Sequence, residues 1–123
     1  MRIKANLAPR LNALLVMTTP VKAAERHLLV TIRSQPAHRP RVQELLLDLL
    51  APVRSEPGCL YYHLFEQAED PNAFVLVAGW ANDEAVAAHP THPEVPGVLA
   101  QLGPLLASPW EVLPTRRVSE ALA

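Results

Sequence analysis

The sequence is poor in cysteine, in glycine and in long apolar runs, and each scarcity excludes a class of protein. Its single cysteine, Cys59, permits no intrachain disulfide and no cysteine-based zinc cluster. No apolar run approaches the roughly 18–20 residues that a membrane-spanning helix needs. The four glycines form neither a phosphate-binding loop nor a dinucleotide fingerprint. The net charge of −1 gives no general indication of nucleic-acid binding.

The 123 residues suffice for one packed domain, and a hydrophobic content of 50% argues against disorder. Charge, however, is divided unevenly along the chain. Residues 1–26 hold five basic groups and one acidic group, whereas the rest holds six basic and eleven acidic groups. We therefore predict a weakly ordered basic extension over 1–26, outside the core, then a domain over 27–118 and a tail over 119–123.

The extension loosely imitates a secretory signal peptide, because three basic residues precede a short apolar segment. That segment spans only about seven residues and contains Asn12, and a poor cleavage site follows it. These features favour a cytoplasmic protein. An alternative is that Met17 is the true start and that the residues before it are an upstream extension.

Hydrophobic periodicity and turn residues predict the elements of the domain. The predicted strands are 27–33, 59–66, 73–80 and 110–118, and the predicted helices are 41–54, 82–89 and 97–107, with an irregular link over 92–96. The main order is strand, helix, strand, strand, helix, strand. This is the split β-α-β-β-α-β arrangement of an α+β, ferredoxin-like fold with an antiparallel sheet. Pro114 cannot donate to a ladder, so the last strand is expected at an edge.

The strands do not alternate cleanly between apolar and polar residues, which indicates a sheet covered on both faces. Helices in this arrangement cover only one face. A helix-free apolar face usually meets a partner, and the economical partner is a second copy of the chain. We therefore predict a homodimer joined sheet to sheet.

Few residues offer chemistry. His89, at the end of a helix, suits a general base near neutral pH, although a satisfied histidine is the commoner role at such a position. Trp80 closes a strand and would pack in the core or stack on a ring. His92 follows His89 at a metal-binding spacing, but Pro90 interrupts the helix between them and no third ligand is evident. Cys59 is expected to be a structural free thiol.

The second strand carries neighbouring polar rings. Tyr62 and His63 point to opposite faces, so one faces the helices and the other faces the expected partner. The sequence leaves open which of them does so. His63 and Thr31 are further candidates for substrate binding.

The segment PGCLYYHLFEQAEDPNAFVLVAGW, followed by His89, resembles the antibiotic biosynthesis monooxygenase family, and in particular its small quinol monooxygenases. The matching positions are Glu56 to Leu60, Tyr62, Asp70-Pro71, Phe74 to Leu76, Trp80, Ala85, His89 and Pro104 to Leu106. The resemblance covers about residues 27–118. It implies a dimeric α+β barrel with a pocket between sheet and helices, and oxygenation of phenols or quinols without metal or flavin.

By position, Trp80 and His89 match the family's recurrent Trp and His, and Tyr62 matches its strand-two Tyr. Two positions depart from the family pattern. Ala78 stands where many members have Glu, and Glu94 stands where many have a second His. Both departures remove polar groups that are expected in the pocket region.

We therefore predict a cofactor-independent monooxygenase that oxidises a small phenol or hydroquinone to a quinone with O₂. His89 would act as the base, Trp80 would stack on the ring, and Tyr62 would donate a second hydrogen bond. One alternative is a non-catalytic dimer that binds an aromatic ligand or serves as a scaffold. Heme degradation is less favoured, because the first strand lacks the Asn found in family members with that activity.

Overall fold

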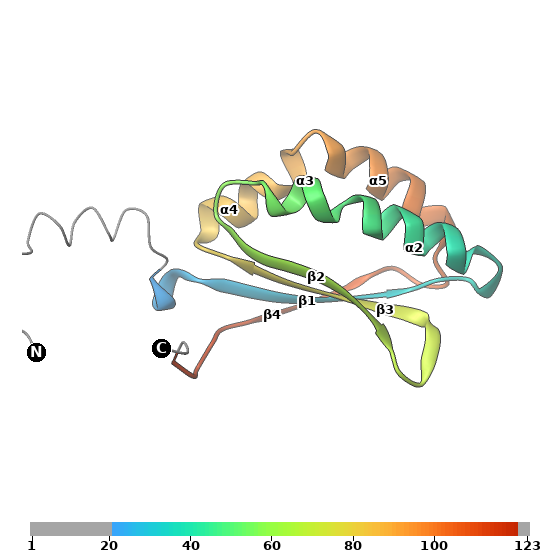
Figure 1. Cartoon of the computed structure of the whole chain (residues 1–123), viewed down its shortest axis with the longest axis horizontal. Helices are drawn as coiled ribbons and strands as arrows, with labels where there is room; N and C mark the ends of the chain where they lie inside the picture. The colour runs from blue at the N-terminus through green and yellow to red at the C-terminus, as the bar shows by residue number, and fades with distance from the viewer. Residues whose placement is uncertain (1–20, 121–123) are drawn as a thin grey trace, which may run out of the picture.

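The computed structural model describes residues 21–120, and predictions about residues 1–20 and 121–123 lie outside this range. A four-stranded antiparallel sheet carries all the α-helices of the described chain on one face (Figure 1). Its strands are β1 (Arg26–Arg33), β2 (Cys59–Gln67), β3 (Asp70–Trp80) and β4 (Glu111–Thr115). The strand order β2-β3-β1-β4 places β4 at an edge and confirms the predicted α+β, ferredoxin-like fold.

The first crossover contains two helices where the sequence predicted one. They are α2 (Arg39–Asp48) and α3 (Leu50–Arg54), and they follow the short 3₁₀ turn η3 (Pro36–His38). The break falls at Leu49 because Pro52 has no N–H to donate to the carbonyl four residues earlier. The two helices nevertheless bury a continuous apolar stripe against the sheet.

The second crossover begins with α4 (Asp83–Ala88), whose N-cap is Asn82, as predicted: its side chain accepts a 2.9 Å hydrogen bond from the Ala85 N–H. It continues through η4 (His89–Thr91), α5 (Glu94–Leu102) and η5 (Gly103–Leu105). The prediction of an irregular link over 92–96 was wrong for its last residues, because α5 already begins there. Pro96 lies in the first turn of α5, where a missing N–H leaves no helical hydrogen bond unmade.

The main core lies between the helices and one face of the sheet. Even-numbered residues of β1 and β3 share that face: Val30 pairs with Leu76, and Leu28 with Ala78. The largest side chains that are almost fully buried are Trp80, Phe74, Ile32, Leu46, Leu102, Val42, Val53 and Val95.

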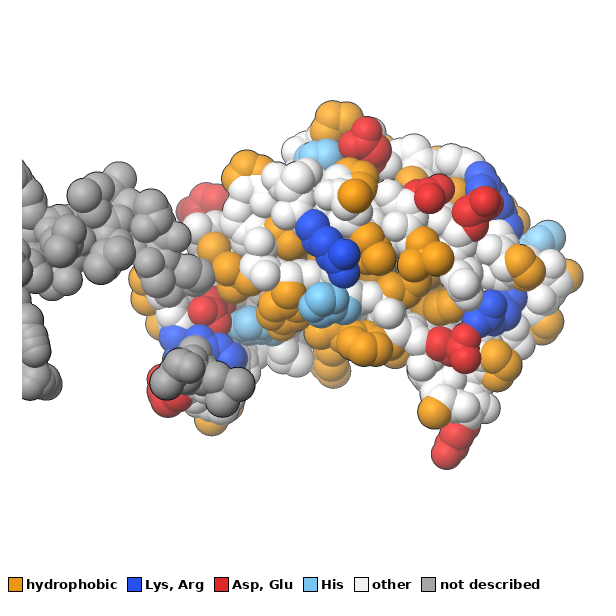
Figure 2. Space-filling view, in the orientation of Figure 1, with side chains coloured by type: hydrophobic (Ala, Val, Ile, Leu, Met, Phe, Trp, Pro, Cys, Tyr) orange, Lys and Arg blue, Asp and Glu red, His pale blue; other side chains and the backbone are white. Residues whose placement is uncertain are grey.

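The opposite face, called here the open face, has no helix over it in the described chain. Four rings follow one another across it at centroid distances of 5.6, 6.0 and 6.4 Å, and we call them the ring row: His27, Tyr61, His63 and Phe65. Phe65 is 53% exposed and Leu113, on β4, is 58% exposed. In the space-filling view, hydrophobic side chains adjoin histidines at the level of the sheet (Figure 2).

Gly79 explains how Tyr61 can lie flat on the open face. These two residues pair across β2 and β3, and a Cβ on Gly79 would meet the Tyr61 ring at 2.2 Å. Any larger residue would lift the ring away from the sheet. The middle of the ring row therefore depends on a glycine in a central strand.

Candidate active site

A cavity of about 180 Å³ lies between the helix-covered face of the sheet and the helices. Its wall is almost entirely apolar, with Tyr62, Trp80, His89 and Trp110 supplying its polar side-chain groups. The remaining lining residues are Leu28, Val30, Ile32, Leu46, Leu49, Leu76, Ala78, Pro90, Val95, Leu99, Leu102 and Val112. An apolar pocket with a few converging polar groups is the usual form of a small-molecule site.

The structure brings together the three residues predicted to be catalytic. His89, the first residue of η4, has its ring centroid 4.8 Å from that of Trp80 and 6.1 Å from that of Tyr62. Trp80 is 1% exposed and Tyr62 is 4% exposed, whereas His89 is half-buried. His89 thus stands at the boundary between the closed part of the pocket and solvent.

A buried carboxylate holds the His89 ring. His89 Nδ1 lies 3.1 and 3.0 Å from the two carboxylate oxygens of Glu56, whose residue is only 6% exposed. An ionised carboxylate only accepts, so Nδ1 carries the proton and donates it. The other ring nitrogen, Nε2, has no protein partner among residues 21–120, so in the neutral imidazole it is the unprotonated nitrogen that a general base requires.

A tight turn delivers Glu56 to this position. Gly58 has φ +85°, a conformation that disfavours other residues, and a Cβ there would meet the Ala85 Cβ of α4 at 2.6 Å. The missing side chain lets the turn after α3 approach α4 closely. Glu56 and His89 are 33 residues apart in sequence and become neighbours through this contact.

Tyr62 supplies the hydroxyl group of the pocket. Its position decides which residue of the second strand faces the helices, a question that the sequence left open. Burial, together with the nearby Glu56, raises the pKa of the Tyr62 phenol far above its usual range. The phenol therefore stays protonated and is suited to donate a hydrogen bond. Arg54 Nε also donates to the Tyr62 carbonyl oxygen at 2.8 Å and fixes the strand there.

Thr31 and His63, the other predicted substrate-binding residues, do not line the pocket. Their strand positions place both on the open face, opposite Val75 and Val77 respectively. His63 lies in the ring row, with Nδ1 3.2 Å from an Arg54 guanidinium nitrogen. Any binding role for this pair belongs to the open face and not to the pocket of the same protomer.

The two departures from the family pattern have unequal consequences. Ala78 is 3% exposed and lines the pocket, so the missing carboxylate leaves additional apolar space there. Glu94 is exposed at the start of α5 and does not line the pocket. Its carboxylate lies 3.7 Å from Nδ1 of His92.

Sequence reasoning missed three residues of this site. Glu56 belongs to the matched Glu56–Leu60 segment, yet the pattern there predicts only a turn. Trp110 and Val112, at the start of the last strand, complete the pocket wall and were assigned no role. For Glu56 the available signal was a lone acidic residue beside a proline-glycine turn in an otherwise matched segment.

The other candidate sites, a metal centre and a reactive cysteine, have less support. Within residues 21–120, no group of three or more His, Cys, Asp and Glu side chains is placed to hold a metal ion. The Cys59 thiol is half-buried, and burial raises its pKa, which disfavours the nucleophilic thiolate. None of the described helices has the length and apolar character needed to cross a membrane.

The chain is similar in sequence to one known protein family and to several known proteins. Residues 26–97 match the family described as antibiotic biosynthesis monooxygenase. The chain is 32% identical over 107 residues to the Mycobacterium tuberculosis protein named "Putative monooxygenase Rv0793", covering 87% of this chain and 100% of that one. It is 30% identical over 94 residues to "Uncharacterized protein sll1783" of Synechocystis, covering 75% of this chain but only 64% of that protein. The chain thus spans less than two thirds of the Synechocystis protein.

Solved structures show the same fold. The structure of Rv0793 from Mycobacterium tuberculosis superposes with a TM-score of 0.76 at 27% identity, covering 80% of this chain and 100% of that one. The structure of PA3566 from Pseudomonas aeruginosa gives a TM-score of 0.75 at 25% identity, covering 80% of this chain and 99% of that one.

Proposed function

Because this chain belongs to the antibiotic biosynthesis monooxygenase family, we propose that it oxidises a small phenol or hydroquinone with O₂ in the pocket beside His89. The observation that carries the proposal is the Glu56–His89 pair. In the neutral imidazole this pairing leaves Nε2 unprotonated, on a residue that lines an apolar, ring-lined cavity. A base in such a place suits the removal of one proton from an aromatic hydroxyl.

The proposed reaction balances without an external reductant. One atom of O₂ enters the ring at a C–H position and the other leaves as water. A phenol with a free ortho or para position thereby gives a quinone, and a hydroquinone gives a hydroxyquinone. The substrate itself supplies all the electrons, through the loss of its O–H and C–H hydrogens.

Deprotonation is the step that the site would promote. A phenolate gives up an electron to O₂ far more readily than a phenol does. A free phenol has a pKa near ~10 and a free histidine near ~6.5, so an unassisted imidazole is a weak base for this task. The pocket must therefore favour the anion, with fixed donors in a water-poor site. Tyr62 would supply one donor, and the Trp80 ring would hold the substrate by stacking.

Ala78 favours a second candidate function, the binding of an aromatic ligand without turnover. Where many relatives carry a carboxylate, this pocket has a methyl group, which leaves Glu56–His89 as its single acid–base pair. A fold by itself does not establish chemistry. Ligand binding without oxygen consumption would support this candidate.

The test of the proposed oxidation uses metal-stripped, flavin-free protein and a panel of phenols, hydroquinones and anthrones. We expect oxygen uptake that depends on both protein and substrate. With ¹⁸O₂, mass spectrometry should find one heavy oxygen atom in the product. Uptake with no label in the product would indicate an oxidase that forms hydrogen peroxide. No uptake with any compound would favour the binding protein.

We further propose that the open face is the interface of a homodimer. Exposed apolar side chains such as Phe65 and Leu113 support this arrangement. Light scattering after size exclusion should show a dimer for the native chain and a monomer for Leu113→Arg. The matched control is Leu47→Arg, since Leu47 is 46% exposed on the helical side of the molecule. A native chain that is monomeric at micromolar concentration would contradict the proposal.

A further inference from the structure

We infer that the pocket selects uncharged, single-ring substrates, which bind with the hydroxyl at His89 and an apolar substituent at the far end. The inference rests on the proposed function in one respect, namely that this pocket is the site. It concerns which aromatic compounds the pocket admits. It therefore separates compounds that differ in charge or in ring number.

The volume of the pocket limits the number of rings. A cavity of about 150 Å³ with aliphatic and aromatic walls holds one benzene ring, and this pocket measures about 180 Å³. One ring with a small substituent therefore fits. Ile32, Leu46 and Leu102 on its walls are at most 2% exposed. Side chains packed this tightly move little, and a tricyclic ring system would fit only by displacing them.

The composition of the wall excludes charge. None of the residues that line the pocket is Lys or Arg. A carboxylate at the far end of the substrate would therefore be desolvated without a partner.

The strand register gives the pocket a direction. Trp80, Tyr62 and His89 gather at one end. Leu76 lies four residues before Trp80 on β3, which is about 13 Å along a strand at ~3.3 Å per residue. Val30 pairs with Leu76 on one side and with Val112 on the other. The end far from His89 is thus apolar apart from the Trp110 indole, and Val112 borders it on the exposed edge strand.

Three probe compounds separate the effect of ligand charge from the effect of ring number. They are 4-methylphenol, which is neutral and has one ring, 4-hydroxybenzoate, which carries a carboxylate in place of the methyl group, and anthrone, which is neutral and tricyclic. Binding is measured without oxygen, so that no turnover occurs. The chain's two tryptophans, Trp80 and Trp110, both line the pocket, and quenching of their fluorescence reports occupancy. Calorimetry checks each affinity independently.

We expect saturable binding of 4-methylphenol. Binding of 4-hydroxybenzoate should be at least about 100-fold weaker, because its charge would be buried without a partner. Anthrone should bind at least about 10-fold more weakly, because the packed wall cannot admit it without strain. Val112 is 51% exposed, so Val112→Arg should fold and place a cation at the far end.

Val112→Arg should strengthen binding of 4-hydroxybenzoate by about 10-fold or more, as a charge-assisted hydrogen bond would. The control, Val118→Arg, adds the same charge at a residue that is 89% exposed and outside the pocket, and should change nothing. The inference is overturned if 4-hydroxybenzoate or anthrone binds the native protein as tightly as 4-methylphenol, or if none of the three binds.

The failure of this inference differs from the failure of the proposed oxidation. Selective anaerobic binding with no oxygen uptake would remove the oxidation and leave the selectivity intact. Equal turnover of neutral and carboxylated rings would remove the selectivity and leave the oxidation intact.

Discussion

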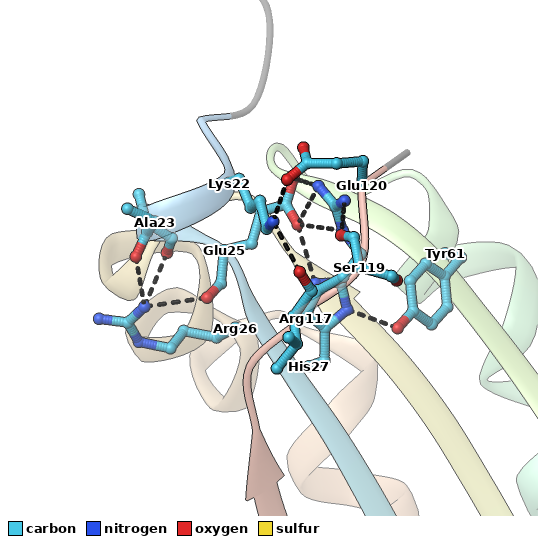
Figure 3. A network of polar contacts seen from close by, with 11 residues as sticks. Lys22, Ala23, Glu25, Arg26, His27, Tyr61, Arg117, Ser119 and Glu120 are labelled. Carbon is cyan, nitrogen blue, oxygen red and sulfur yellow. Dashed lines mark hydrogen bonds and ion pairs between the residues drawn. The ribbon is translucent and has the colours of Figure 1, made fainter. Parts of the chain in front are cut away.

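Two pairs of a buried carboxylate and a histidine lie within the described chain, Glu56–His89 at the pocket and Glu25–His27 at the end of the sheet. Both glutamates are 6% exposed, and each contacts a ring nitrogen of its histidine at about 3 Å. Their surroundings differ. Arg117 donates two hydrogen bonds to the Glu25 carboxylate, at 3.1 and 3.2 Å, and the Tyr61 hydroxyl lies 2.6 Å from His27 Nδ1 (Figure 3).

The two pairs differ in whether all the polar groups of the histidine are engaged. Both ring nitrogens of His27 are engaged, and the Glu25 charge is compensated by Arg117. The hydrogen bond from Arg117 is also the main cause that lowers the pKa of Glu25. The polar groups of His27 and Glu25 therefore all have partners within this network. At the pocket, no cation bonds to Glu56, and His89 keeps one nitrogen free for a ligand within the described chain.

Replacing each histidine gives the largest expected difference between the two pairs. His89→Ala should lower turnover of a phenol or hydroquinone by ~10²–10⁴-fold, the usual contribution of a positioned general base. His27→Ala should leave turnover per folded molecule nearly unchanged and should lower the melting temperature instead. Oxygen uptake and thermal unfolding of the two variants provide the measurements.

The contrary outcomes are also clear. A His89→Ala protein that consumes oxygen at the native rate would show that another group removes the proton. A His27→Ala protein that is folded and inactive would place the Glu25 network in the chemistry.

Replacing the glutamates should have a smaller effect. Glu56→Gln keeps the shape of the side chain but allows the amide to donate to Nδ1, which would put the proton on Nε2 and remove the free base. We expect a fall in kcat of about 10–100-fold with little change in KM, typical of a group that orients a catalytic residue. Glu56→Asp should restore part of the activity, and Glu25→Gln should retain nearly all of it.

The Glu25 network should appear most clearly in stability against pH. Because the folded-state pKa of Glu25 is lowered below its ordinary 4.5, its contribution is present above that pH. It is lost as the pH falls from 4.5 through the lowered pKa. Glu25→Gln should reduce the free energy of unfolding by about 1–3 kcal/mol at pH 7. Urea titrations should show this difference shrinking at pH 3, and an equal difference at both pH values would contradict the account.

Most of the fold could be predicted from the sequence, because the residue patterns that mark strands and helices lie within short segments. The helix boundaries were less predictable. The sequence predicts a break that includes Pro96, although a proline in the first turn of a helix leaves no helical hydrogen bond unmade. The site was only partly readable. His89 and Trp80 were found, but the choice between Tyr62 and His63 depends on which strand parity faces the helices, which the sequence did not decide.

The Glu56–His89 contact could not be predicted from residue spacing. It depends on Gly58 permitting the turn after α3 to approach α4 closely. That is a tertiary effect between segments far apart in the chain. For the same reason, the pairing of Glu25 with Arg117, 92 residues away, had no local signal.

The contacts of Lys22 determine how the domain should respond to mechanical force. Its ammonium group donates to the Val118 carbonyl at 2.8 Å and pairs with the Glu120 carboxylate at 2.7 Å, so the two ends of the described chain are tied together (Figure 3). Beyond this tie, β1 and β4 run antiparallel from the His27–Thr115 pair. Tension on the two ends would therefore break the hydrogen bonds of that ladder one residue pair at a time, which is an unzipping geometry. It would not load all of them in shear. A domain held this way should yield at low force, and β4 should be the first strand to leave the sheet.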